Sequence, residues 1–248
     1  MLPPLEWKPR SCLLDRLPPA ICTRLAPDLQ PVDLPVGKVL LDAGNGHGEG
    51  GNGHHVYFIR SGIVSVLYLT ANGDSGEIAS VGNEGMVGMM LLAGSPRVGT
   101  RAVVQAPGEA FALRMDVFER EFNRGGAFQA MVLAHTRWLL AQLAQAAICN
   151  RHHSIEKQLC RWLLLGFDRQ GGCGELRITH EALANLLGVR REGVTEAAGR
   201  LQEAGAISYS RGCIRLQQRK ALEQRACECF ALLHHDYRQL CMGPPFGG

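Results

Sequence analysis

The chain has 248 residues, of which 46% are hydrophobic and 20% charged, and its formal net charge is +3. This composition excludes a disordered, collagen-like or membrane-embedded protein and is typical of one or two globular domains. Positive charge is concentrated toward the C-terminus, where residues 151–248 carry 14 Lys and Arg against 10 Asp and Glu. Such a balance favours a surface that faces phosphate groups in this part of the chain.

The first thirty residues predict short helices interrupted by prolines. Between residues 32 and 114 the chain consists of short runs rich in Val, Ile and aromatic residues, separated by Gly or Asn-Gly. This pattern is typical of antiparallel strands joined as hairpins, and Asn72-Gly73 is expected to form one of the turns. We therefore predict an N-terminal antiparallel β-roll of the jelly-roll type.

Three histidines, His47, His54 and His55, lie in the glycine-rich segment 45–55. Histidine is a common metal ligand, but neither a cysteine nor a pair of carboxylates accompanies them to define a coordination geometry. A solvated loop between two strands is the expected structure. The sequence predicts no metal site.

After residue 115 the residue pattern becomes typical of helices, and segment 127–149 is the longest apolar stretch of the chain. Polar and charged residues interrupt it, so we expect a long helix of a water-soluble domain rather than a membrane span. Because the helix is apolar around most of its circumference, it must be covered on more than one side. The alternatives are an intrachain bundle and, as favoured here, pairing with a second copy through near-heptad positions such as Val132, Leu139 and Ala146.

Residues 178–206 fit two helices joined by a tight turn, after a further amphipathic helix over 155–169. Thr179 is suited to cap the first helix, and Gly188 to supply the positive φ of the turn. Two short β runs follow around Arg211, which predicts a hairpin directly after the second helix. The apolar residues expected to pack the two helices together are Leu183, Ala184, Leu187, Val189, Val194, Ala197 and Leu201. This combination is a winged helix-turn-helix.

The N-terminal end of the second helix carries polar residues whose chemistry suits DNA. In this motif that end enters the major groove, where Arg binds guanine through two hydrogen bonds and Glu accepts one from cytosine. The predicted base-reading residues are Arg191, Glu192, Thr195 and Glu196, and the predicted phosphate contacts are Thr179, Arg190, Arg200 and Arg211. The structural alternative is a solvated helix face stabilised by Arg–Glu pairs.

VYFIRSGIVSVLY, followed by a glycine-containing hairpin and GNEGMVG, resembles the cyclic-nucleotide-binding-type β-roll of the Crp/Fnr family of bacterial transcription regulators. ITHEALANLLGVRREGVTEAAGRLQEAGAI resembles the DNA-binding helices of that family. The resemblance covers residues 30–220 and implies a homodimer that binds a two-fold symmetric site in double-stranded DNA and contacts RNA polymerase.

The expected fold class is therefore α+β, in four parts. These are a β-roll domain with N-terminal helices over 1–126, a dimerisation helix over 127–150, a winged helix-turn-helix over 151–225, and a C-terminal helix and tail over 226–248.

The candidate effector pocket departs from the nucleotide-binding members of the family, which carry Gly-Glu and then an Arg. Gly88 is followed here by Met89, whose thioether cannot replace the hydrogen bonds of a carboxylate to ribose. Arg97 and Arg101 are the remaining candidates for a phosphate contact, so the pocket would comprise these four residues. Cyclic AMP is not expected to bind, no cofactor is predicted, and another effector, or none, is left open.

The nine cysteines are odd in number and scattered, which predicts mostly free thiols in a reduced, cytoplasmic protein. Oxygen-sensing members of the family that this chain resembles group cysteines near the N-terminus, whereas only Cys12 and Cys22 lie there in this sequence. The resemblance therefore does not favour an iron–sulfur centre. Cys227 and Cys229 are expected to point to nearly opposite sides of a helix, which is unsuited to one metal ion. Cys149 and Cys160 flank the expected hinge between the domains, which leaves a thiol-responsive regulator as an alternative.

The sequence contains no Walker loop, G-x-S-x-G or H-E-x-x-H motif, so no enzyme is predicted. The histidine pairs at 152–153 and 234–235 are expected to be polar surface residues rather than metal ligands. A β-roll dimer whose winged helix binds a protein is the competing class. Salt dependence separates the two, because a DNA reader loses affinity steeply as salt rises.

Overall fold

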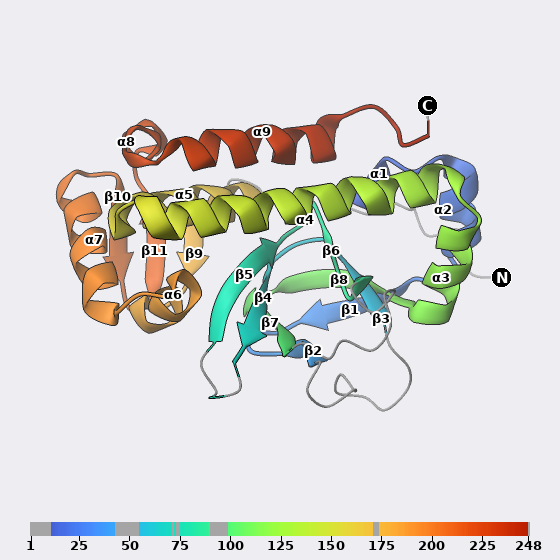
Figure 1. The fold of residues 1–248 in the computed structure, drawn as a ribbon, viewed down its shortest axis with the longest axis horizontal. Coiled ribbons are helices and arrows are strands. Elements are labelled where there is room, and N and C mark those ends of the chain that lie inside the picture. The colour runs from blue at the N-terminus through green and yellow to red at the C-terminus, as the bar shows by residue number, and fades with distance from the viewer. Residues whose placement is uncertain are drawn as a thin grey trace.

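The computed structural model describes residues 11–42, 55–70, 72, 75–89, 99–170 and 174–247. Two four-stranded antiparallel sheets form an N-terminal β-roll, with strand orders β1-β8-β3-β6 and β2-β7-β4-β5 (Figure 1). The strands are β1 (Gln30–Leu34), β2 (Val39–Asp42), β3 (His55–Ile59), β4 (Ile63–Leu69), β5 (Ser75–Val81), β6 (Met86–Val87), β7 (Thr100–Ala106) and β8 (Gly108–Arg114). The predicted α+β class and antiparallel β-roll are confirmed.

The alternating sequence pattern explains how these strands pack. Along β7, Ala102, Val104 and Ala106 are buried, while the residues between them are partly exposed, as the two-residue period of a strand requires. The predicted hairpin between β4 and β5 is confirmed by the pairing of Leu69 with Ser75. Its turn residue Gly73 lies outside the described residues.

Two short helices, α1 (Cys12–Asp15) and α2 (Pro19–Leu25), precede the β-roll, and α3 (Met115–Asn123) and the long α4 (Gly126–His152) follow it. Pro19 begins α2 instead of interrupting a helix, because the first helical position needs no N–H donor. The C-terminal part contains α5 (Ile155–Arg169), β9 (Glu175–Arg177), α6 (His180–Leu187), α7 (Arg191–Glu203), β10 (Ile207–Ser210), β11 (Cys213–Leu216), α8 (Arg219–Arg225) and α9 (Glu228–Met242). Within the described ranges, no helix has both the length and the apolar character needed to cross a membrane.

Helix α4 lies between the β-roll and α9, which runs back alongside it (Figure 1). The apolar helix is thus covered within its own chain on two sides, with Phe128, Met131 and Trp138 in the core. Val132 belongs to this core and is only 1% exposed. The prediction that Val132 faces a second copy is therefore wrong, and the first large apolar residue exposed on α4 is the next one, Leu133.

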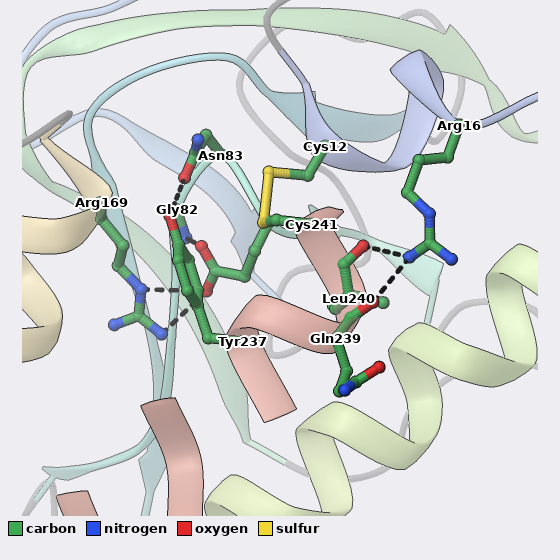
Figure 2. Close-up of a disulfide and its surroundings, with 10 residues drawn as sticks. Cys12, Arg16, Gly82, Asn83, Arg169, Tyr237, Gln239, Leu240 and Cys241 are labelled. Carbon is green, nitrogen blue, oxygen red and sulfur yellow. Dashed lines mark hydrogen bonds and ion pairs between the residues drawn. A yellow bond between two sulfur atoms is a disulfide. The ribbon is translucent and has the colours of Figure 1, made fainter. Parts of the chain in front are cut away.

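The C-terminal end of α9 is fastened to the N-terminal part of the chain (Figure 2). A disulfide joins Cys12 to Cys241, and Arg16 donates hydrogen bonds to backbone carbonyls in the last turn of α9. The Tyr237 hydroxyl donates to the Asn83 side chain at 3.2 Å. Six of the described cysteines are free, so the prediction of mostly free thiols is confirmed for this part of the chain, with one pair as the exception.

A buried ion pair joins α5 to the β-roll. A guanidinium nitrogen of Arg169 lies 2.8 Å from a Glu84 carboxylate oxygen, and the two side chains are 2% and 0% exposed. Arg169 also donates to the carbonyl of Ser80 at 2.7 Å and to the Gln142 amide oxygen of α4 at 3.1 Å. Because a buried charge without its partner is strongly destabilising, these contacts define one orientation of α5 on the β-roll.

His135 of α4 supplies a pH-dependent contribution to stability. It is fully buried, and its Nε2 accepts a hydrogen bond from the Met86 N–H at 3.1 Å. Burial lowers the pKa of His135 from 6.5 to about 3. Protonation below pH 6.5 therefore favours the unfolded chain, and this contribution is lost as the pH falls from 6.5 toward 3.

We predict that His135→Gln reduces the pH dependence of stability, since its amide oxygen can accept the same hydrogen bond but does not titrate. Between pH 7 and pH 5 the wild type should lose about 2 kcal/mol more free energy of unfolding than the variant. Urea unfolding at both pH values measures this difference. Equal losses in the two proteins would contradict the assignment.

Candidate nucleic-acid interface

Individual residues determine where the two helices of the helix-turn-helix begin and end. The Ala182 N–H donates to the Thr179 side-chain oxygen at 3.1 Å, which confirms the predicted cap of α6. Gly188 ends α6 with a φ of 65°, in the left-handed region that glycine adopts without strain. Arg190 then has extended backbone at the N-cap of α7. The turn thus redirects the chain within three residues.

The predicted apolar residues pack α6 against α7. Leu183, Val194, Ala197 and Leu201 are fully buried, and Ala184 is small where the two helices meet. Burial of this face leaves the opposite face of α7 exposed at one end of the molecule (Figure 1). The four predicted base-reading residues, Arg191, Glu192, Thr195 and Glu196, are all exposed there.

Within the described part of the chain, Arg191 and Glu196 make only long, exposed ion pairs, and that of Glu196 is a 4.0 Å contact with Arg200. The Arg191 side chain is 67% exposed, and its only ion pair in the described residues is a 3.9 Å contact with Glu181. A pair this long and exposed contributes little stability, so the guanidinium is available to a ligand. Thr195 is more constrained, because its hydroxyl donates to the Arg191 carbonyl and lies 3.1 Å from His180 Nδ1.

His180 is a residue of the candidate interface that sequence reasoning missed. Its ring stacks on Tyr209 of β10 with centroids 4.0 Å apart, while Nδ1 contacts Thr195 of α7. Partial burial, and then the Arg191 cation, lower the pKa of His180 and favour its neutral form. One side chain therefore links α6, α7 and β10. Nothing in the neighbouring sequence distinguishes His180 from other polar residues that follow a helix cap.

The wing is the predicted hairpin of β10 and β11, extended by pairing of β11 with β9. Arg211 and Gly212 at its tip have φ of 48° and 73°, the left-handed pair that suits a two-residue hairpin turn. Arg211 lines a groove of about 640 Å³ between the wing and the β-roll, together with Arg177 and Arg215. Arg177 and Arg215 both pair with Glu175 in this groove, so Arg211 is the cation at the wing tip itself.

The other predicted phosphate contacts lie in different environments. Arg190 is exposed at the start of α7, whereas the Thr179 side chain is engaged as the cap of α6. Arg200 lies one helical turn or more beyond the base-reading residues, and its Nε donates to Glu156 of α5 at 2.7 Å. Arg190 and Arg211 are thus the phosphate candidates with the fewest internal contacts.

The candidate effector residues are only partly described, since Arg97 lies outside the described residues. Gly88 has a φ of 103°, and a Cβ there would collide with the His55 carbonyl. Met89 lies against α4, with its sulfur 3.3 Å from His135 Nδ1. Arg101 pairs with Asp42 on the neighbouring strand at 2.7 Å. Met89 and Arg101 therefore both have partners within the chain.

A cluster of possible metal ligands lies where α4 meets α9. The ligand atoms of Cys149, His153, Cys227 and Cys229 all lie within 4.8 Å of one another. The prediction that the Cys227 and Cys229 side chains diverge is wrong, because Cys227 is not helical. Its φ of −80° and ψ of 166° place it in extended backbone at the N-cap of α9. His153, also expected on the surface, is part of this cluster.

Two family models match the chain. A model of the cyclic nucleotide-binding domain matches residues 47–124, and a model of the Crp-like helix-turn-helix domain matches residues 157–225. Together they cover more than half of the chain. A β-roll of this kind followed by a DNA-binding helix-turn-helix defines a class of transcription regulators.

Individual proteins and solved structures are also similar to this chain. The anaerobic regulatory protein of Bacillus subtilis is 25% identical over 167 residues, covering 64% of this chain and 70% of that protein. The CRP-like cAMP-activated global transcriptional regulator of Mycobacterium tuberculosis is 26% identical over 228 residues, covering 88% and 97%. Among solved structures, FixK2 from Bradyrhizobium japonicum superposes with a TM-score of 0.64 at 16% identity, covering 80% of this chain and 98% of its own. A regulator from Eubacterium rectale gives 0.63 at 18% identity, covering 86% and 96%. The chain belongs to the Crp/Fnr family of transcription regulators.

We predict that Arg191→Ala costs about 1–3 kcal/mol of binding free energy on the preferred DNA site and relaxes specificity at one base pair. Arg211→Ala should instead weaken binding to all sequences alike, since a phosphate contact carries no sequence information. Fluorescence anisotropy on specific and scrambled duplexes measures both effects. Arg238→Ala, which removes an exposed cation from α9, is the charge-matched control. Equal losses on both duplexes for Arg191→Ala would exclude base reading.

Proposed function

We propose that this regulator acts as a homodimer whose two α7 helices bind the half-sites of a palindromic operator. The observation that carries the proposal is an apolar stripe on α4 that neither the β-roll nor α9 covers. It consists of Leu133, Leu140, Leu143 and Ile148, whose side chains are 57%, 61%, 37% and 52% exposed.

The spacing of this stripe suits a helix pair. Leu133 and Leu140 are seven residues apart, and Ala147 continues the heptad on the same exposed side. Large apolar side chains in such a row mark an interaction surface. Two copies of α4 packed along it would form a short coiled coil. A two-fold axis through that contact would place two recognition helices for half-sites about one helical turn apart.

The exposed end of α7 supplies the specificity in this proposal. Arg191, Glu192 and Glu196 would contact base edges together with Thr195, while Arg190 and Arg211 would fix the register through phosphates. The protein would act in the bacterial cytoplasm, where it would also contact RNA polymerase. No catalytic activity is proposed.

An effector in the β-roll would act by binding two conformations of the dimer with different affinities. Gly88, Met89, Arg97 and Arg101 are the candidate residues for this pocket. The Mycobacterium tuberculosis relative is named as cAMP-activated, but Met89 stands here in place of the ribose-binding carboxylate. We therefore do not propose cyclic AMP as the effector.

We predict that Leu140→Glu abolishes the dimer, because the two-fold axis would bring two carboxylates together in an apolar contact. Analytical ultracentrifugation should show a monomer, and affinity for a palindromic site should fall by about 100-fold as the second half-site contact is lost. Leu232→Glu is the matched control, since Leu232 is 53% exposed on α9 outside the stripe. A Leu140→Glu protein that remains dimeric would overturn this assignment of the interface.

A further inference from the structure

The cysteine–histidine cluster between α4 and α9 is not used by the DNA-binding proposal. Cys149 lies near the C-terminal end of α4, and His153 is the C-cap residue of that helix. Cys227 and Cys229 lie at the start of α9, more than seventy residues later. The three thiols are 0%, 4% and 1% exposed and form a small buried group separate from the main apolar cores. Nothing in the helix-turn-helix requires three sulfur atoms to be buried together.

We propose that Cys149, His153, Cys227 and Cys229 bind one Zn²⁺ ion. The sulfur atoms of Cys149 and Cys227 are 3.6 Å apart. The Cys229 sulfur is also 3.6 Å from His153 Nδ1. A tetrahedral zinc ion, with Zn–S of about 2.3 Å and Zn–N of about 2.0–2.1 Å, separates its ligand atoms by about 3.6–3.8 Å. These two separations match the spacing around a single ion, and all four ligand atoms lie within 4.8 Å of one another.

The ligand set and its compactness identify the metal. Three thiolates and an imidazole are a zinc-binding combination, whereas carboxylates and carbonyls would suit magnesium or calcium. An iron–sulfur cluster places several iron and sulfide atoms between its thiolates, and would spread them beyond the 4.8 Å that contains all four ligand atoms here. Four protein ligands leave no open position, so the site is structural rather than catalytic.

The surroundings of the cluster support metal binding. His153 Nε2 lies 3.3 Å from a Glu228 carboxylate oxygen, which directs Nδ1 toward the thiols in the carboxylate–histidine–metal arrangement. Three thiolates and one Zn²⁺ would leave one net negative charge. Arg161 follows Gln158 by one turn of α5, and its Nε is buried with no hydrogen-bond partner among the described residues. Arg161 is therefore positioned to offset that charge.

The site lies at the expected hinge, where α4 ends and α5 begins. The chain leaves α4 at His153 and enters α5 after Ser154, which caps that helix. Gln158 of α5 donates to the carbonyls of Cys149 and His153 at 3.4 Å and 3.0 Å. A bound ion would fasten the start of α9 to this corner and so fix the angle between α4 and the DNA-binding domain. Metal binding at this site does not depend on the proposed function. An effect of the metal on DNA binding does rest on the proposed function.

Metal analysis of the full-length protein, purified under reducing conditions, tests the site. Elemental analysis should find one zinc per chain. Substitution with Co²⁺ should give the visible d–d bands and the thiolate charge-transfer band of a tetrahedral centre. His153→Ala and Cys227→Ser should lose the metal, whereas their matched controls His152→Ala and Cys22→Ser should retain it. Glu228→Gln should weaken metal affinity by about tenfold to hundredfold.

Several results would overturn the site. One is a folded wild-type chain that takes up neither Zn²⁺ nor Co²⁺. Another is full metal retention in both His153→Ala and Cys227→Ser. A third is acid-labile sulfide with the broad visible absorbance of an iron–sulfur cluster. If circular dichroism shows that a variant does not fold, the wild type is tested instead. Its metal is removed by chelation, zinc or Co²⁺ is added back, and the Co²⁺ spectrum is the readout.

DNA binding by the zinc-loaded and chelated wild type tests the hinge role separately. We expect chelation to weaken affinity for the operator at least tenfold and zinc to restore it. Equal affinity of the two forms would overturn the hinge role and leave the metal site standing. If neither form binds any DNA sequence although the loaded form holds one zinc per chain, the proposed function fails and the metal site does not.

Discussion

The buried ion pair between Arg169 and Glu84 determines how the two halves of this molecule are arranged. Arg169 belongs to α5, Glu84 to the turn before β6, and Gln142 of α4 completes the contacts of the guanidinium. A charge with almost no access to water is compensated only while all of these groups keep their positions. Any shift of the β-roll that reaches the DNA-binding domain must therefore either move α5 as well or break this contact.

Helix α5 transmits this constraint to the recognition helix. At Gly193 a side chain on α7 would collide with Ile155, so α7 lies close against the start of α5. The same end of α5 adjoins the corner where α4 ends and where the cysteine–histidine cluster lies. The position of α7 thus depends on Arg169 at one end of α5 and on the cluster at the other. An effector in the β-roll and a metal ion at the corner would act on the same helix.

Features governed by local chemistry could be predicted from the sequence. The two-residue period of β7, the Thr179 cap and the positive φ of Gly188 each follow from one residue and its near neighbours. The exposed face of α7 could be predicted as well, because the apolar residues on the other face of this helix could be assigned to the contact with α6. The assignment of individual DNA contacts stays a prediction.

The missed features depend on contacts between residues far apart in the chain. Arg169 and Glu84 are 85 residues apart, and Cys12 and Cys241 are 229 apart. The Val132 assignment failed because α9 and the β-roll cover that side of α4, and the sequence does not show which faces neighbours will cover. The metal-ligand cluster was missed because one residue, Cys227, precedes its helix instead of belonging to it.

The proposed function requires two copies of this chain to bind a specific two-fold symmetric DNA site. Selection of bound duplexes from a random pool, with purified protein and no added ligand, tests it most directly. We expect an enriched palindrome with half-sites about one helical turn apart. A pool that stays random, or an enriched motif without two-fold symmetry, would contradict it.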